Sequence, residues 1–357
     1  MNRQILIEEN IGETRAAVVE NGRIVELHLE RWSEAGTRAI ENEIYRGRVR
    51  RVEPALNAAF VDIGLGPDGF LPFGKAGRPK GFHEGSAIGV RIAREGYAEK
   101  GPNLALVEVE EGDAPDCLEP APILAQRLVR DFGDAEAVWA DETDHDLDAA
   151  FEEALEARAA IPGGGSLYIE TTRALTAIDV DADGRKGQGN AQRLTQQLNV
   201  SAAKEAARQV RLRGLGGIIA IDFVHMRAQP DRKASEQALR QGFRRDRAKV
   251  DVAPLSQFCI GELARQRRGR TLAEIMLDAD GQPSAETAAL NVLRQAEREI
   301  ARAKGRPVQL VCGEAVADWL EKSDISWQEA FMERHGRMPE LIEKTDLDPR
   351  QARVDVR

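Results

Sequence analysis

Three aspartates at the ends of two short apolar segments are the residues of this sequence best suited to do chemistry. Asp179 and Asp181 close the segment ALTAIDVDADG, and Asp222 closes GGIIAID. Both apolar runs have the length and β-branching of buried strands. An ionised carboxylate at the end of such a strand is costly unless a cation, hydrogen bonds or a ligand compensates it. Two such strands in one sheet would bring the carboxylates to one edge, as Mg²⁺ prefers, which predicts a metal-dependent phosphoryl-transfer centre.

Each aspartate also has a simpler explanation, because aspartate is common where a strand ends and a helix is capped. The repeat of the same I-D-[V/F] element favours the catalytic interpretation, and so does the charge around it. The chain is acidic overall, with 50 Lys and Arg against 60 Asp and Glu, which alone argues against a nucleic-acid ligand.

The segment 161–270 nevertheless carries 20 basic and 11 acidic residues, a local excess of nine positive charges. Its arginines gather in the runs 208–213, 243–249 and 264–270. Charge runs are commonly solvated helix faces, which would explain about half of these arginines. Runs on both sides of an acidic pair fit a polyanion better, because phosphates supply the compensating negative charge.

The length of 357 residues is enough for two or three domains. No stretch approaches the roughly 20 apolar residues of a membrane span. The first residues alternate like a hairpin about Asn21 and Gly22 and lack the pattern of a signal peptide, so a cytoplasmic protein without membrane contact is expected. The widely spaced Cys117, Cys259 and Cys312 predict neither a disulfide framework nor a zinc site.

The segment 43–73 is rich in short strands and glycine turns, and strand-like runs follow at 87–93 and 104–109. This pattern predicts a small closed barrel of the OB kind. Phe60 and Phe70 are either ordinary barrel core or, on an open strand face, a platform on which bases stack. On such a face Arg46 and Arg48 would line an electrostatic groove for a single strand. Elsewhere, the pattern predicts helices over 149–160, 190–211 and 288–304.

Four segments, in the same order, resemble the ribonuclease E/G family: EIYRGRVRRVEPALNAAFVDIGLGPDGFLPF, GGSLYIETTRALTAIDVDADG, RLRGLGGIIAIDFVHM and ELARQRRGRTL. The resemblance covers most of residues 1–271. It implies an α+β multidomain fold, with a split RNase H-like domain, an inserted OB-fold barrel, a DNase I-like catalytic α/β domain and a small C-terminal α/β module. The RNase H-like domain would comprise residues 1–35 and a reduced remainder, 111–160, and the OB-fold barrel would comprise 36–110. The catalytic domain would comprise 161–275 and the C-terminal module 276–357.

The resemblance also implies roles for individual residues. Asp179 and Asp222 correspond to the aspartates that bind Mg²⁺. Asp181 stands where the family has an asparagine that orients them, so it is either a third ligand or a weaker orienting group.

In the barrel, Phe60 and Phe70 correspond to the family's base-contacting aromatics, whereas Ile63 stands where a tyrosine is usual. Lys100 corresponds to a lysine near the scissile strand. The implied partner is therefore single-stranded RNA.

The implied activity is Mg²⁺-dependent endonucleolytic hydrolysis of single-stranded RNA, in rRNA processing or mRNA decay, which leaves a 5′-phosphate and a 3′-hydroxyl. A non-catalytic or weakly catalytic RNA-binding factor on the same fold is the alternative. A DNA enzyme with the same acidic pair is disfavoured by the RNA-type barrel.

Two departures from the family pattern qualify this resemblance. The segment 110–128 is too short to contain the family's pocket for a 5′-monophosphate, and the segment 273–287 lacks the C-P-x-C zinc link between protomers. A zinc-linked tetramer is therefore not expected, while a homodimer stays open.

Overall fold

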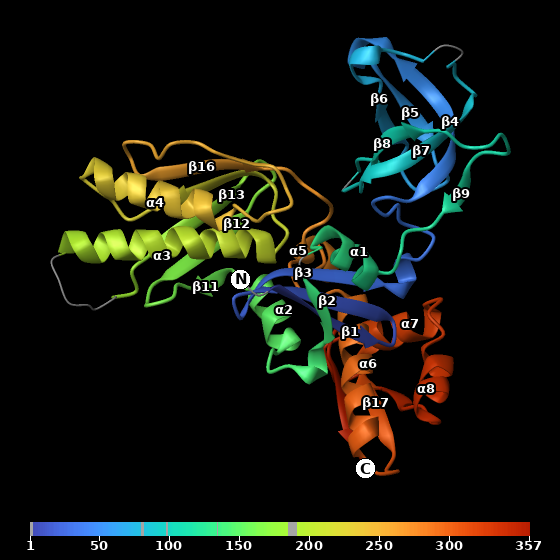
Figure 1. Ribbon diagram of the computed structural model, residues 1–357. Coiled ribbons are helices and arrows are strands. Elements are labelled where there is room, and N and C mark those ends of the chain that lie inside the picture. Colours follow the sequence, from blue (N-terminus) through green and yellow to red (C-terminus); the bar gives the residue numbers. More distant parts are fainter. Residues whose placement is uncertain (1–2, 80–81, 98, 134, 185–190) are drawn as a thin grey trace. The chain divides into compact units, whose positions relative to one another are not determined.

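The computed structural model describes residues 3–79, 82–97, 99–133, 135–184 and 191–357 (Figure 1). The chain forms two compact units. Unit 1 contains residues 1–6, 17–27 and 138–273, and unit 2 contains residues 7–16, 28–137 and 274–357. Both units mix helices and strands, which confirms the predicted α+β class.

A six-stranded sheet in the order β11-β12-β13-β14-β16-β15 organises unit 1. Its strands are β11 (Arg158–Ala160), β12 (Ser166–Thr171), β13 (Thr176–Asp181), β14 (Gly217–Asp222), β15 (Val250–Val252) and β16 (Ile260–Arg265). Only β13 and β14 pair in parallel within this described sheet. A parallel pair needs a crossover connection, and helix α3 (Ala191–Leu212) supplies it.

Helices α3 and α4 (Gln229–Gly242) lie side by side along one face of this sheet (Figure 1). We call the face of the sheet that these two helices cover the covered face, and the opposite face of the sheet the open face. Apolar residues at alternate strand positions, such as Ile178 and Ile219, pack on the covered face against a row of alanines on α3. The alanines let the helix approach the strands closely. The core therefore lies on the covered face, and the other alternate positions of each strand belong to the open face.

One sequence expectation fails beside this sheet. Helix α2 (Leu147–Leu155) ends five residues before the predicted end at residue 160. Its C-cap, Glu156, has extended backbone angles, and the chain continues as β11. The glycine turn at 163–165 folds β11 back onto β12, so backbone pairing at a sheet edge replaces the last helical turn.

The predicted barrel is present in unit 2 and has five strands: β4 (Ile44–Glu53), β5 (Ala58–Asp62), β6 (Gly69–Pro72), β7 (Ala87–Arg94) and β8 (Asn103–Val107). Neighbours follow the order β5-β6-β8-β7-β4, and pairing of β4 with β5 closes the ring. Counted from β4, this is the strand order 1-2-3-5-4 of an OB-like fold. Strand β9 (Asp116–Glu119) extends the sheet along β4.

The N-terminal strands β1 (Arg3–Asn10), β2 (Glu13–Glu20) and β3 (Arg23–Arg31) form a sheet with β10 (Glu136–Trp139), in the order β10-β1-β2-β3. Asn21 and Gly22 have φ angles of 53° and 78°, as a two-residue turn of type I′ requires. The predicted hairpin is confirmed. In the sequence, helix α1 (Leu124–Asp131) precedes β10, and α2 follows it. The short 3-10 helices are η1 (Trp32–Glu34), η2 (Pro54–Leu56), η3 (Gly74–Ala76) and η4 (Ala140–Glu142).

The C-terminal part packs helices on a sheet of order β18-β17-β19. Its elements are α5 (Leu272–Met276), α6 (Ala285–Arg302), β17 (Val308–Cys312), α7 (Glu314–Lys322), α8 (Trp327–His335), β18 (Glu340–Glu343) and β19 (Ala352–Val356). The predicted helix in 288–304 is confirmed but begins earlier, because the Ser284 side chain accepts the Thr287 N–H and caps α6.

All three cysteines are free; Cys117 is exposed, and Cys259 and Cys312 are buried. Burial raises the pKa of the Cys312 thiol to about 12. In the described part of the chain, no helix combines the length and apolarity that a membrane crossing needs.

Candidate active site on the open face of the sheet

Asp179 and Asp222 are direct neighbours at the ends of the two parallel strands. The register pairs Thr176 with Ile219 and ends by pairing Asp179 with Asp222. Neighbouring strands lie about 4.8 Å apart, and aligned residues of a parallel pair point to the same face. The predicted juxtaposition of these two acids, called the acidic pair below, is therefore confirmed.

The local sequence explains why both carboxylates face solvent. Ile178 and Val180 flank Asp179 and are buried on the covered face. Ile221, which precedes Asp222, is also buried on that face. Since side chains alternate along a strand, both aspartates must lie on the open face, where they are exposed. Two adjacent carboxylates repel each other, and a cation between them would remove that repulsion.

Asp181 shares the open face with Asp179, two residues further along β13. Its Oδ1 accepts the backbone N–H of Asp183 at 2.8 Å, which fixes the turn after the strand. The described residues contain no group of three or more His, Cys, Asp or Glu side chains that could hold a metal ion. The structure thus brings together two of the three predicted acids, and the role of Asp181 as a ligand stays a prediction.

Two open-face residues beside the acidic pair were missed by sequence reasoning. The antiparallel register places Tyr168 of β12 opposite Asp179, and Arg158 of β11 opposite Tyr168. Directly opposed residues have Cβ atoms about 5 Å apart. Tyr168 is 38% exposed, so a flat aromatic surface lies next to the carboxylates. The alternation in SLYIET carried this signal, because Leu167 and Ile169 are buried.

Arg158 is held in place by Asp183, whose Oδ2 accepts its Nη2–H at 2.8 Å. The hydroxyl of Ser166 also donates to Asp183. Hydrogen bonds from Ser166 and then Arg158 lower the pKa of the Asp183 carboxyl below its ordinary value. The same carboxylate raises the pKa of Arg158, so a fixed positive charge stands at the end of the open-face row.

The barrel presents a second pair of neighbours, Phe60 on β5 and Phe70 on β6. Their rings pack edge to face with centroids 5.8 Å apart, and the Arg51 guanidinium lies 4.7 Å from the Phe60 ring centre. Both phenylalanines are half-buried and lie outside the barrel's core cluster. Nucleotides bind an OB fold on the face formed by its second and third strands, and in this barrel those strands are β5 and β6.

Lys100 lies in the loop between the fourth and fifth barrel strands, the other usual contact region of an OB fold. It is exposed, and its Nζ lies 5.6 Å from the centre of the Tyr97 ring. The structure therefore places Phe60, Phe70 and Lys100 on the elements where an OB fold contacts nucleic acid. Their contact with RNA stays a prediction.

The side chains of Arg46 and Arg48 form hydrogen bonds with backbone carbonyl groups of the chain. Arg46 donates to the carbonyl oxygens of Glu110 and Asp113 at 3.1 Å each, and Arg48 donates to that of Ala114 at 2.8 Å. These bonds fasten the segment that leaves the barrel. Their predicted contact with RNA has no support from this geometry.

The prediction that the arginine runs form a phosphate-binding surface is wrong for several of their members. Arg211 is buried between Glu20 and Glu26, with its Nη2 3.1 and 2.9 Å from their Oε1 atoms. Arg265 is buried in a two-point ion pair with Asp246, at 2.7 and 3.0 Å. Buried cations need such partners, so these charges stabilise unit 1 and do not reach solvent.

Comparisons with known proteins agree with this arrangement. The family model described as "Ribonuclease E/G family" matches residues 110–268. Ribonuclease E of Escherichia coli (strain K12) is 25% identical over 454 positions, which cover 90% of this chain and 42% of that protein. Ribonuclease G of Haemophilus influenzae is 24% identical over 473 positions, covering 95% of this chain and 94% of that protein.

The chain spans less than half the length of the ribonuclease E relatives, 42% and 48% of two of them. The alignments are also longer than the chain. Of 454 and 473 positions, only 357 can hold a residue of this chain, so at least 97 and 116 positions are occupied in the relative alone. This supports the prediction that a stretch of the family is missing here; its place at 110–128 stays a prediction.

Proposed function

We propose that the chain is a member of the ribonuclease E/G family and an endoribonuclease that hydrolyses single-stranded RNA in RNA processing or decay. The observation that carries the proposal is the pairing of Asp179 with Asp222 on the open face. Within the proposal, the sheet of unit 1 corresponds to the DNase I-like catalytic domain and the barrel to the RNA-binding domain. The RNase H-like assignment of the N-terminal strands belongs to the same proposal.

The acidic pair fits Mg²⁺. This ion binds proteins through one or two carboxylates and completes its shell with water and substrate phosphate oxygens. The two exposed carboxylates satisfy that requirement, whereas a zinc site needs three or four protein ligands, a group absent among the described residues. Bound there, Mg²⁺ would supply an activated water and neutralise charge on the scissile phosphate.

The chain's own residues would hold the RNA in position for hydrolysis. Phe60 and Phe70 would stack bases, and Lys100 would contact the backbone, so that the strand is held unstacked. On the open face, Tyr168 would support the base next to the scissile phosphate, while Asp179 and Asp222 hold the cation. Holding the phosphate in one orientation supplies a large part of catalysis, because hydrolysis then becomes effectively unimolecular. Hydrolysis would leave a 5′-phosphate and a 3′-hydroxyl.

The test incubates the purified protein with labelled single-stranded RNA, duplex RNA and single-stranded DNA, with Mg²⁺ or with EDTA. We expect cleavage of single-stranded RNA only, with Mg²⁺ only, and 5′-phosphate ends on the products. The double variant Asp179→Asn/Asp222→Asn is the control for a contaminating nuclease.

RNA that is bound but never cut would support the alternative, an RNA-binding factor. Cleavage of DNA at a comparable rate would contradict the assignment of RNA as substrate. The proposal also includes a cytoplasmic location and permits a homodimer without a zinc link.

A further inference from the structure

A cavity bounded by α3 and α4 gathers positive charge that the acidic pair does not use. Its volume is about 620 Å³, within the range for small-molecule sites. It lies between the tip of the β2–β3 hairpin, the second half of α3 and the end of α4. Its wall contains one carboxylate, that of Glu20, and six basic side chains: Arg23, Lys204, Arg208, Arg211, Arg244 and Arg245. We call it the basic pocket.

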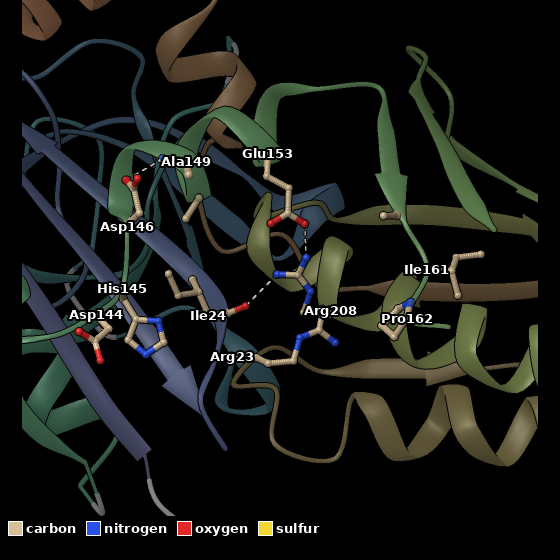
Figure 2. A pocket seen from close by; sticks show the side chains of 12 residues that line it. Arg23, Ile24, Asp144, His145, Asp146, Ala149, Glu153, Ile161, Pro162 and Arg208 are labelled. Carbon is tan, nitrogen blue, oxygen red and sulfur yellow. Dashed lines mark hydrogen bonds and ion pairs between the residues drawn. The ribbon is translucent and has the colours of Figure 1, made fainter. Parts of the chain in front are cut away.

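Three of these cations are neutralised by glutamates. The ion pairs are Arg23 with Glu205 (2.9 Å), Arg208 with Glu205 (2.7 Å) and with Glu153, and Arg211 with Glu20 (3.1 Å) and Glu26 (2.9 Å). Figure 2 shows Arg208 anchored by Glu153 and by the carbonyl oxygen of Ile24, with Arg23 beside it. These arginines form a rigid wall with little net charge.

The other three cations have no such partner in the described part of the chain. Lys204 and Arg244 are exposed, and no ion pair or side-chain hydrogen bond is formed by either of them within the described ranges. Arg245 is half-buried, and its Nη1 is fully buried without a hydrogen-bond partner among the described residues. A buried donor without a partner is costly, and a donor on a cation more so. Arg245 also has no carboxylate partner among the described residues, and an anion held at the pocket wall would neutralise its charge.

A neighbouring cavity shows what distinguishes the basic pocket. The cavity in Figure 2 shares Arg23 and Arg208 with it but also contains Asp144, Asp146 and Glu153. Those three carboxylates outnumber its two arginines, so it would repel an anion. The basic pocket has the opposite balance, with three unneutralised cations from two different elements.

We propose that the basic pocket binds phosphate groups and is a site separate from the acidic pair. The helix layer, about 10 Å thick, lies on the covered face, while the acidic pair lies on the open face, so one phosphate cannot occupy both. Two sources of phosphate fit: the backbone of an RNA that extends beyond the cleaved segment, and a free phosphate or nucleotide. The proposal holds whether or not the chain cleaves RNA.

The experiment removes one free cation at a time, in Lys204→Ala, Arg244→Ala and Arg245→Met. Lys233→Ala is the matched control, because Lys233 is exposed on α4 and absent from the pocket wall. Binding is measured in EDTA with a labelled RNA longer than the roughly 16 nucleotides that one barrel covers at most. Inorganic phosphate is titrated separately by calorimetry, and cleavage of a short oligomer is followed with Mg²⁺.

We expect each pocket variant to bind the long RNA about tenfold more weakly, as for a lost charge-assisted hydrogen bond. The slope of log affinity against log salt should fall by about 0.7 per variant. Lys233→Ala should match the wild type, and all variants should cut the short oligomer normally. If only phosphate binding is lost, the site serves a small anion and the proposal still stands.

Two results would overturn it. One is unchanged binding of both ligands in the pocket variants; the other is an equal loss in Lys233→Ala, which would show only the effect of net charge. Arg245→Met separates a binding role from a packing role, because removing an unpartnered donor should leave the melting temperature unchanged or raise it. A lower melting temperature with normal binding would show that Arg245 is structural, and would contradict the proposal.

Discussion

The barrel and the six-stranded sheet each bring two like residues together on neighbouring strands, but the pairs are suited to different tasks. Phe60 and Phe70 form an uncharged edge-to-face pair, a kind of surface on which nucleic-acid bases stack regardless of sequence. Asp179 and Asp222 form a charged pair that repels phosphate unless a cation lies between them. Under the proposed function, RNA binding and hydrolysis belong to separate elements, so each should be removable without the other.

The largest effect is expected from the acidic pair. Asp179→Asn or Asp222→Asn should lower the cleavage rate by about a thousandfold or more, about 4 kcal/mol, because each change removes one of the two proposed metal ligands. RNA affinity should stay the same or rise as repulsion falls. Single-turnover cleavage and fluorescence anisotropy measure the two quantities. A variant that retains a few per cent of the rate at saturating Mg²⁺ would show that the chemistry lies elsewhere.

Changes to Phe60 and Phe70 should weaken RNA binding and leave the rate of hydrolysis nearly unchanged. Phe60→Ala and Phe70→Ala should each weaken RNA binding by about 1–3 kcal/mol, the range for a lost stacking contact. The rate at saturating RNA should change little. Phe82→Ala is the matched control, because Phe82 is buried in the barrel core against Phe73.

In that control the expected loss is about 3–5 kcal/mol of stability instead of affinity. Equal losses of melting temperature in all three variants, without loss of affinity in the folded protein, would mean that Phe60 and Phe70 are barrel core.

Tyr168 sharpens the comparison, because it puts an aromatic ring beside the carboxylates. Tyr168→Ala should raise KM about fivefold, about 1 kcal/mol, through lost stacking on one base. Tyr168→Phe keeps the ring and should behave like the wild type. If Tyr168→Phe is as impaired as Tyr168→Ala, the hydroxyl is the important group and stacking is not.

Part of this arrangement could be predicted from the sequence, because some features depend only on residues that are close together in the chain. The acidic pair was predictable because an apolar run followed by aspartate occurs twice, and the glycine turns likewise predict the barrel strands. Tyr168 was not predictable in the same way. Its position beside Asp179 follows from an antiparallel register that only the folded sheet defines.

The arginine runs show the limit most clearly. Arg211 and Arg265 look like surface charge in the sequence but are buried, because their partners Glu20, Glu26 and Asp246 come from other strands and loops. Charge counted along a chain therefore does not give the charge of a surface.

The smallest expected effect concerns the 5′ end of the RNA. The segment 110–128 is acidic and is fastened to the barrel by Arg46 and Arg48, so it offers a terminal phosphate little attraction. Cleavage rates on one RNA with a 5′-hydroxyl, monophosphate or triphosphate should therefore agree at fixed salt. A tenfold preference for the monophosphate, about 1.4 kcal/mol, would reveal a sensor elsewhere on the chain.

The central claim is that the acidic pair holds a cation against the scissile phosphate. The most direct test replaces one non-bridging oxygen of that phosphate by sulfur and compares cleavage in Mg²⁺ and in Cd²⁺. Mg²⁺ binds sulfur poorly, whereas a softer ion accepts it. We predict that sulfur slows cleavage in Mg²⁺, that Cd²⁺ restores it in the wild type, and that Asp179→Asn and Asp222→Asn are not restored. Slowing that is equal in both metals would contradict the account.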